Sequence, residues 1–127
     1  MRVVVDASFA IEAYLESGGS RLASLRHEET LSPSIYVDEC RNVIITKVRS
    51  GVVDRQAGQR ALNDVLFLPD QIGAAVTELV FDLALDHGLS GYDASYLALA
   101  VERGDAIATL DKQLQRAAID LGLVVFS

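Results

Sequence analysis

Short apolar runs alternate with longer helical patterns along this chain, and the alternation limits the folds that it can adopt. Runs that suit buried strands lie at 2–6, 105–109 and 123–126, and helical patterns separate the first from the others. Two parallel strands must be joined by a crossover of a dozen or more residues, which is usually a helix. The pattern therefore predicts an α/β fold in which helices cover both faces of a central parallel sheet.

Glycines and capping residues set the expected boundaries of the helices. Asp54 is a suitable N-cap, and Gly51, Gly88 and Gly122 are suitable stop signals. We expect helices at 7–16, 20–27, 34–50, 55–66, 74–87, 90–103 and 111–121. Residues 30–33 fit either a brief strand or a loop, and residues 69–73 fit a connector with room for a short strand before it.

The composition indicates one intracellular domain spanning 1–127. Half of the 127 residues are hydrophobic, which suffices for a single core without disulfides, and Cys40 has no second cysteine to pair with. The first apolar run is interrupted by Asp6, so it does not resemble the core of a signal peptide. No run is long enough to span a bilayer. We therefore expect a soluble, cytoplasmic protein that does not associate with membranes.

Charge is distributed unevenly along the chain. The net charge of −7 disfavours a nucleic-acid partner, because phosphates are repelled by an acidic surface. However, five basic residues lie between 41 and 60 with only Asp54 among them, whereas 61–102 contains seven acidic residues and no Lys or Arg. The five basic residues are Arg41, Lys47, Arg49, Arg55 and Arg60. This arrangement suits a metal-using nuclease, although ordinary solvated helix faces explain either segment equally well.

Three aspartates lie close to places where one expected element gives way to the next. Asp6 ends the first strand and Asp111 follows the strand at 105–109, so either residue fits a simple helix N-cap. Asp93 lies three residues after Ser90, as in a capping box. Each aspartate alone is thus explained by helix capping.

The helix that begins at Ser90 has an expected apolar stripe, and Asp93 lies beside it. This stripe comprises Ala94, Leu97, Ala98 and Val101.

Glu39 is the one candidate that capping does not explain, because it lies in the middle of the expected helix 34–50. The apolar stripe of that helix comprises Val37, Cys40, Ile44 and Val48. Glu39 projects away from this stripe, so periodicity favours a solvated surface glutamate.

Several carboxylates that converge at the edge of a sheet would repel one another unless a cation were bound. Hard cations such as Mg²⁺ or Mn²⁺ prefer oxygen ligands and promote phosphodiester hydrolysis without a Ser–His pair. His27 and His87 are the only histidines, and there is no zinc motif or glycine-rich phosphate loop. A phosphatase that uses Asp6 as its nucleophile is an alternative, but Ser8 stands where phosphatases of the haloacid dehalogenase type have a second Asp.

Four short motifs, in this order, resemble those of the PIN-domain family. They are VVVDAS at 3–8, VDECRNV at 37–43, LSGYDASYLALA at 89–100 and ATLDKQL at 108–114. The third is the most specific, and the order and spacing of the four agree over nearly the whole chain. The length resembles that of VapC-type toxins within this family.

The resemblance implies a three-layer α/β/α fold and one site with one or two Mg²⁺ or Mn²⁺ ions. Asp6 and Asp93 are the implied metal ligands, and Glu39 and Asp111 complete the site directly or through water. Ser8 and Thr109 match positions that support the acidic cluster by hydrogen bonds. These six residues are the candidate site that the resemblance gives.

The implied activity is hydrolysis of RNA by a metal-dependent endoribonuclease with water as the nucleophile. The implied biological role is that of the toxin of a type II toxin–antitoxin pair, held inactive by a cognate antitoxin and commonly homodimeric. The alternative is a PIN-like protein-interaction module with weak or no nuclease activity. Acidic residues at all four positions disfavour that alternative.

Overall fold

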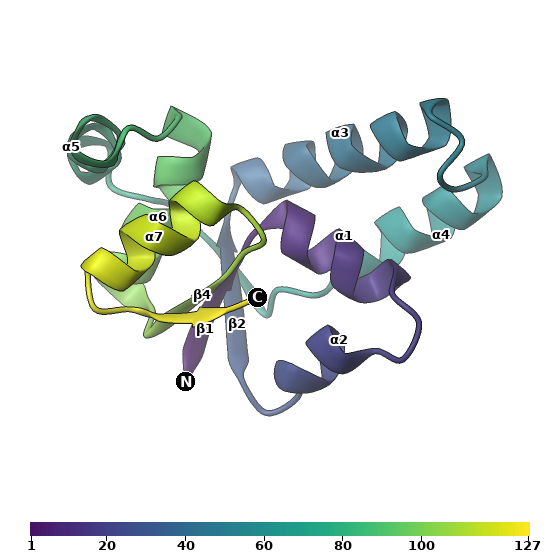
Figure 1. The fold of residues 1–127 in the computed structure, drawn as a ribbon, viewed down its shortest axis with the longest axis horizontal. Helices are drawn as coiled ribbons and strands as arrows, with labels where there is room; N and C mark the ends of the chain where they lie inside the picture. The colour runs from purple at the N-terminus through teal and green to yellow at the C-terminus, as the bar shows by residue number, and fades with distance from the viewer.

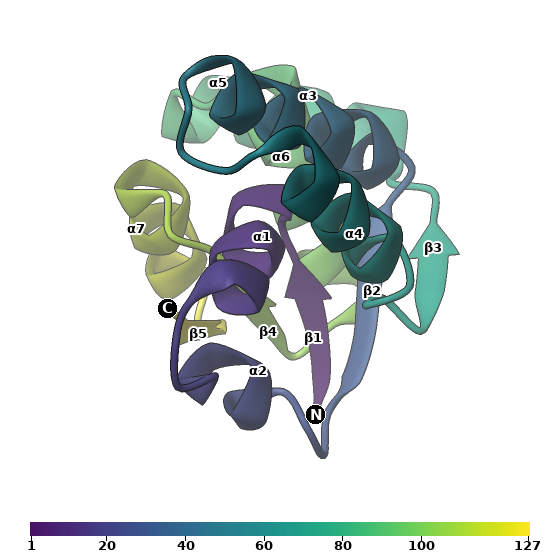
Figure 2. The same ribbon diagram turned by 90° about the vertical axis from the view of Figure 1, so that its right-hand side faces the viewer.

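A computed structural model describes residues 1–127 and contains a five-stranded parallel sheet (Figure 2). The strands lie in the order β3-β2-β1-β4-β5, so that β1 is at the centre. Their bounds are Arg2–Val5 for β1, Glu29–Pro33 for β2, Gln71–Gly73 for β3, Ala106–Ala108 for β4 and Val124–Phe126 for β5. All four strand pairings are parallel, as the alternation of strands and helices predicted.

Seven helices cover the two faces of the sheet (Figure 1). They are α1 (Ala7–Leu15), α2 (Ser20–Ser24), α3 (Ile35–Arg49), α4 (Arg55–Val65), α5 (Thr77–His87), α6 (Gly91–Arg103) and α7 (Lys112–Asp120). Helices α1 to α4 lie on one side, where α1 packs against α3 and α4, and α5 to α7 lie on the other. This confirms the three-layer α/β/α fold. None of the helices combines the length and the apolar composition that crossing a membrane requires.

The core is formed by the central strand and by the helix that packs directly on the sheet. Val3, Val4 and Val5 are fully buried, and α6 contacts β1, β2 and β4. The stripe expected on α6 is only partly correct, because Val101 is 42% exposed whereas Leu99 is fully buried. Helix α6 lies between the sheet and α5, so it is buried on more than the single face that periodicity describes.

Tertiary pairing explains two differences from the expected boundaries around the edge strand β3. Residues 30–33 belong to a strand, and the expected connector 69–73 contains β3 rather than following a strand. Gly73 pairs with Pro33, and the backbone N–H of Asp70 donates to the carbonyl of Thr30 at 2.9 Å. Because this pairing holds the chain extended through Gly73, α5 begins at Thr77 rather than at Ala74.

Helix α2 is shorter than the sequence pattern indicated, ending at Ser24 rather than at His27. The backbone N–H of Leu25 bonds to the carbonyl of Leu22, and that of Arg26 bonds to Ala23. These bonds span three residues instead of four, so they tighten the chain into turns that lead to β2. The remaining helices and strands lie within about two residues of their expected bounds.

Candidate active site

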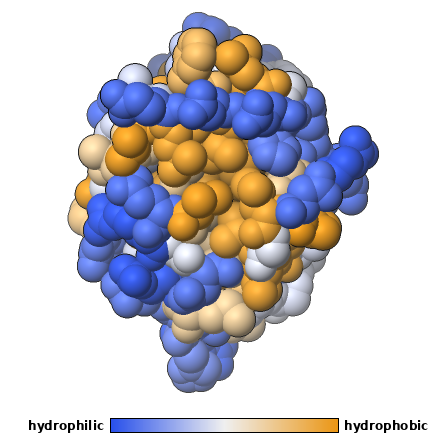
Figure 3. Space-filling view, turned by 90° about the vertical axis from the view of Figure 1, so that its left-hand side faces the viewer, coloured by the Kyte–Doolittle hydropathy of each residue, from blue (hydrophilic) through white to orange (hydrophobic).

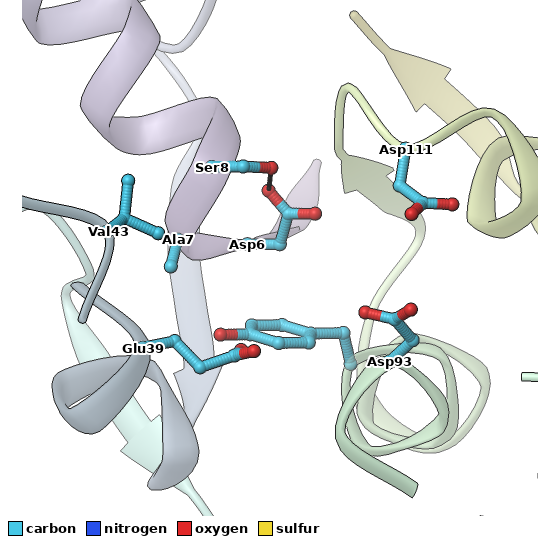
Figure 4. A pocket seen from close by; sticks show the side chains of 8 residues that line it. Asp6, Ala7, Ser8, Glu39, Val43, Asp93 and Asp111 are labelled. Carbon is cyan, nitrogen blue, oxygen red and sulfur yellow. Dashed lines mark hydrogen bonds between the residues drawn. The ribbon is translucent and has the colours of Figure 1, made fainter. Parts of the chain in front are cut away.

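The carboxyl ends of the neighbouring strands β1 and β4 position the candidate site. Val5 pairs with Ala108, and the backbone N–H of Asp6 donates to the carbonyl of Ala108 at 3.1 Å. A pocket of about 200 Å³ opens at this edge of the sheet (Figure 4). It is lined by Asp6, Ala7, Ser8, Glu39, Val43, Asp93, Tyr96 and Asp111. The fold therefore brings all four candidate carboxylates to one pocket, from the starts of α1, α6 and α7 and from α3.

Asp6 serves both as a helix cap and as a wall of this pocket. One carboxylate oxygen, Oδ1, accepts from the backbone N–H of Phe9 at 2.8 Å and from the hydroxyl of Ser8 at 3.0 Å. The other, Oδ2, accepts from the hydroxyl of Thr109. The side chain is only 5% exposed, so these bonds fix both oxygens within the end of the sheet.

Thr109 links two of the candidate carboxylates, although it does not line the pocket itself. Its hydroxyl accepts from the backbone N–H of Asp111 at 3.1 Å, and the same hydroxyl donates to Asp6. A hydroxyl has one proton to donate, so the bond to Asp6 uses it. Thr109 is fully buried, and its carbonyl accepts from the side-chain amide of Gln115 at 2.7 Å. Thr109 thus holds the segment that connects β4 to α7 beside Asp6.

Glu39 is half-buried and lines the pocket, so the surface position favoured by helical periodicity is wrong. The reason is that α3 has two covered faces near its beginning. Cys40 and Ile44 pack into the core, and Glu39 and Val43 face the pocket that α6 closes from the opposite side. A single apolar stripe on a helix does not reveal a second, polar contact face.

Asp93 forms only half of the capping box that its spacing from Ser90 suggested. The hydroxyl of Ser90 accepts from the backbone N–H of Asp93 at 3.1 Å, which caps α6. The carboxylate of Asp93 makes no reciprocal bond to the backbone of Ser90; it is half-buried and lines the pocket. Asp111 caps α7, as expected, by accepting from the backbone N–H of Leu114 at 2.9 Å, and it also lines the pocket.

Burial and mutual repulsion raise the proton affinity of this cluster. Burial raises the pKa of Asp6 to about 6 against the hydrogen bonds it accepts, and the charge of Asp93 adds to the increase. Burial is also the largest cause that raises the pKa of Glu39, and the charge of Asp93 raises it further. Burial likewise raises the pKa of Asp93 most, and the charge of Asp111 adds to this increase. No Lys or Arg lines the pocket, so this repulsion lacks a positive side chain to compensate it.

Tyr96 is a pocket residue to which the sequence analysis gave no role. It is 1% exposed and lines the carboxylate pocket, and its hydroxyl lies beside the carboxylate of Glu39 without the geometry of a formed hydrogen bond. Burial raises the pKa of this hydroxyl, and the neighbouring carboxylate of Glu39 raises it further. The only sequence signal was its spacing, because a residue three positions after Asp93 lies on the same side of the helix.

The donor chemistry of the pocket fits a hard divalent cation. Carboxylate oxygens are the ligands that Mg²⁺ and Mn²⁺ prefer, and the repulsion among these groups would be relieved by positive charge. The carboxylates surround the pocket without converging on one point, since no three of them form a ready ligand set. An ion would therefore be held by some of these side chains directly and by the others through water.

The sequence model that describes the PIN domain family matches residues 3–120 of this chain. Ribonuclease VapC3 of Pyrobaculum aerophilum is 31% identical over 123 residues, which cover 90% of this chain and 92% of the relative. Exonuclease VapC9 of the same organism is 30% identical over 124 residues, which cover 93% of this chain and 89% of the relative.

Two solved structures share the fold. The crystal structure of PAE2754 from Pyrobaculum aerophilum has a TM-score of 0.78 at 25% identity and covers 98% of this chain and 83% of its own. Mycobacterium tuberculosis VapC20, described as a Sarcin-Ricin loop cleaving toxin, has a TM-score of 0.59 at 16% identity and covers 91% of this chain and 94% of its own. The second likeness concerns the fold alone. From the family model and the two VapC relatives it follows that this chain belongs to the PIN-domain family and is of the VapC type.

Proposed function

We propose that this protein is a Mg²⁺- or Mn²⁺-dependent endoribonuclease, the toxin of a type II toxin–antitoxin pair, acting in the cytoplasm. The observation that carries the proposal is the single pocket lined by Asp6, Glu39, Asp93 and Asp111, with no basic side chain among them. The names of the two VapC relatives, a ribonuclease and an exonuclease, support a nuclease. The substrate is an RNA phosphodiester bond, and the nucleophile is water.

In this proposal Asp6 and Asp93 hold the cation, and Glu39 and Asp111 complete its surroundings directly or through water. A bound divalent cation supplies positive charge to the scissile phosphate and lowers the pKa of the attacking water. The three hydrogen bonds on Asp6 keep its oxygens oriented, so that Ser8 and Thr109 act as supports.

Proton transfer falls to the carboxylates with raised pKa values. A half-buried carboxylate such as Glu39 is suited to accept the proton that the attacking water releases, because its pKa lies above that of an exposed glutamate. The same property makes protons compete with the cation. Cation binding should therefore weaken as the pH falls toward about 6, the pKa of Asp6 in the metal-free protein, and activity at limiting cation concentration should decline with it.

A cognate antitoxin and a second copy of the chain are the proposed protein partners. Hydrophobic side chains gather on the face that α5 and α7 present (Figure 3). The exposed apolar side chains of these two helices include Phe81, Leu85 and Ile119, which are 63%, 69% and 64% exposed. Exposed apolar patches of this kind suit protein contacts. An antitoxin would silence the enzyme by blocking access of RNA or by placing a basic side chain among the carboxylates, where the pocket has none of its own.

Linear and circular forms of one RNA test the activity and its endonucleolytic mode. Purified protein with Mg²⁺ or Mn²⁺ should cut both forms, and EDTA should stop the reaction. Cleavage of the linear form alone would show an exonuclease instead. If neither form is cut, the interaction-module alternative takes precedence, and a covalent phospho-aspartate at Asp6 would indicate the phosphatase.

Thermal unfolding with and without the cation tests the metal site separately. Millimolar Mg²⁺ or Mn²⁺ should stabilise the wild-type protein, because a ligand that binds only the native state shifts the folding equilibrium. Asp93→Asn should leave the metal-free stability unchanged or higher, since it removes one of the repelling charges, and it should abolish the stabilisation by the cation. A cation effect that survives this substitution would contradict the assignment of Asp93.

A further inference from the structure

An acidic protein gains less of its RNA affinity from phosphate contacts than a basic protein does. The net charge is −7, and the pocket that faces the scissile phosphate is lined by carboxylates and no basic residue. Phosphate contacts by Lys and Arg normally dominate nucleic-acid binding. A single-stranded RNA also offers its bases, which bind by stacking on aromatic rings.

A second hollow, of about 260 Å³, adjoins the carboxylate pocket and shares Glu39 with it. Its lining residues are Ile35, Asp38, Glu39, Asn42 and Tyr92. The four residues from α3 recur at intervals of three and four, so they form one side of that helix. Tyr92 belongs to the first turn of α6 and immediately precedes Asp93 of the carboxylate pocket. A group bound in this hollow would therefore lie beside the carboxylate pocket.

Tyr92 is available for stacking, because its side chain is 63% exposed and its hydroxyl makes no hydrogen bond. An isolated exposed aromatic residue is ordinary on a protein surface. Tyr92 differs in that it borders a hollow whose other side chains are mainly polar. No Lys or Arg lines this hollow, and Arg41, further along α3, lies 3.4 Å from Asp38 as an exposed ion pair. The chemistry of the hollow thus suits a flat, uncharged ligand with a polar edge rather than a phosphate.

We propose that this hollow is a nucleobase subsite for the nucleotide beside the scissile phosphate. The ring of Tyr92 stacks on the base, and the side chains of Asn42 and Asp38 hydrogen-bond to its edge. Stacking accepts any base, so the subsite provides affinity for single-stranded RNA with limited choice of sequence. The inference rests on the proposed ribonuclease function and adds to it the part of the substrate that an acidic protein binds without charge attraction.

Two fluorescent RNA probes of equal length test this subsite, one with all its bases and one abasic throughout, so that their phosphates match in number. Binding is measured in EDTA, which prevents cleavage. Tyr92→Ala should weaken binding of the base-bearing probe roughly 5- to 100-fold and leave the abasic probe unaffected. The loss should persist at high salt, because stacking releases no counterions. Tyr92→Phe keeps the ring and should bind like the wild type.

Phe67→Ala is the matched control, since Phe67 is an aromatic residue that is 86% exposed and lines a separate hollow with Tyr14 and Leu68. Phe67→Ala should change neither the affinity for the base-bearing probe nor that for the abasic probe. The subsite is wrong if Tyr92→Ala leaves both affinities unchanged or weakens both equally, even though the wild type cuts RNA in Mg²⁺. Absence of RNA cleavage by the wild type would instead contradict the proposed function, and Tyr92-dependent binding of the bases would still support the subsite.

Discussion

At the scale of single residues, Asp6 forms hydrogen bonds that hold the fold together, but burial of its charge opposes folding. Its carboxylate caps α1 and accepts from Thr109, yet burial raises its pKa to about 6 from an ordinary value of 3.8. The folded protein thus binds a proton at Asp6 more tightly than the unfolded chain does. It follows that ionised Asp6 opposes folding at neutral pH unless a cation is bound.

We predict that Asp6→Asn stabilises the metal-free protein in a pH-dependent way. The favourable contribution of Asp6 is fully present below its unfolded pKa and is lost as the pH rises through about 6. Relative to the variant, the wild type should lose about 2–3 kcal/mol of unfolding free energy between pH 4 and pH 7.5. Urea unfolding in EDTA measures this difference. If the difference in unfolding free energy between the wild type and the variant does not change with pH, then the pKa of Asp6 is not raised in the folded protein.

The two most buried tyrosines provide a matched pair of substitutions with opposite expected effects. The hydroxyl of Tyr36 donates to the carbonyl of Val65 at 2.6 Å, whereas that of Tyr96 forms no hydrogen bond of good geometry, although the carboxylate of Glu39 lies beside it. Tyr36→Phe should cost about 1 kcal/mol of unfolding free energy, because it removes a buried hydrogen bond and leaves the Val65 carbonyl with only the backbone N–H of Leu68. Tyr96→Phe should cost nothing or stabilise. Urea unfolding compares them, and equal losses would mean that the hydroxyl of Tyr96 has a partner in solution.

At the scale of elements, the sequence predicted the strands and helices well because local signals determine most of them. Asp54 caps α4 through the backbone N–H of Ala57, and Gly88 ends α5 with a φ of 64°. The short edge strand β3 and the start of α5 were not predicted, because pairing with β2 decides them. The burial of Glu39 was missed for the same reason: its neighbour Tyr96 lies more than fifty residues further along the chain. Motif resemblance, rather than periodicity, selected Glu39.

The basic residues of α3 and α4 provide the prediction that belongs to this scale. Both Arg49 and Arg55 are exposed and form no ion pair, whereas Lys47 lies 2.5 Å from Glu12. Arg49 is ten residues beyond Glu39, which is about 15 Å along a helix. RNA that extends from the pocket along α3 would pass within reach of it.

We predict that the double variant Arg49→Glu, Arg55→Glu weakens RNA binding at low salt and that the loss shrinks at high salt. Measuring the affinity for RNA across a salt series gives the loss at low salt and the loss at high salt. Lys47→Gln is the control and should have a smaller effect, since Glu12 already compensates this charge. Unchanged affinity of the double variant at low salt would exclude this path for the RNA.

At the scale of the whole molecule, the proposed toxin role predicts a growth phenotype. Expression of the wild-type chain without its antitoxin should slow growth, and Asp6→Asn should relieve this effect, because Asn supplies no anionic ligand for the cation. The variant should fold, since Asn retains the shape and can cap α1. It should also still bind the antitoxin, whose docking would rest on apolar helix faces. Growth, circular dichroism and co-purification measure the three outcomes, and a harmless wild type would contradict the toxin role.

Asp6 and Asp111 are both helix caps and pocket carboxylates. This combination also restricts the substitutions by which the protein could lose its activity during evolution. Each caps a helix through a backbone N–H, at 2.8 Å from Phe9 and 2.9 Å from Leu114. Replacement by Ala would remove the cap and cost about 1 kcal/mol in addition to the activity. Replacement by Asn or Ser would remove the charge and keep an acceptor for the backbone. Descendants that retain only a binding role should therefore carry Asn or Ser at these two positions, and Glu39, which caps nothing, should vary more freely.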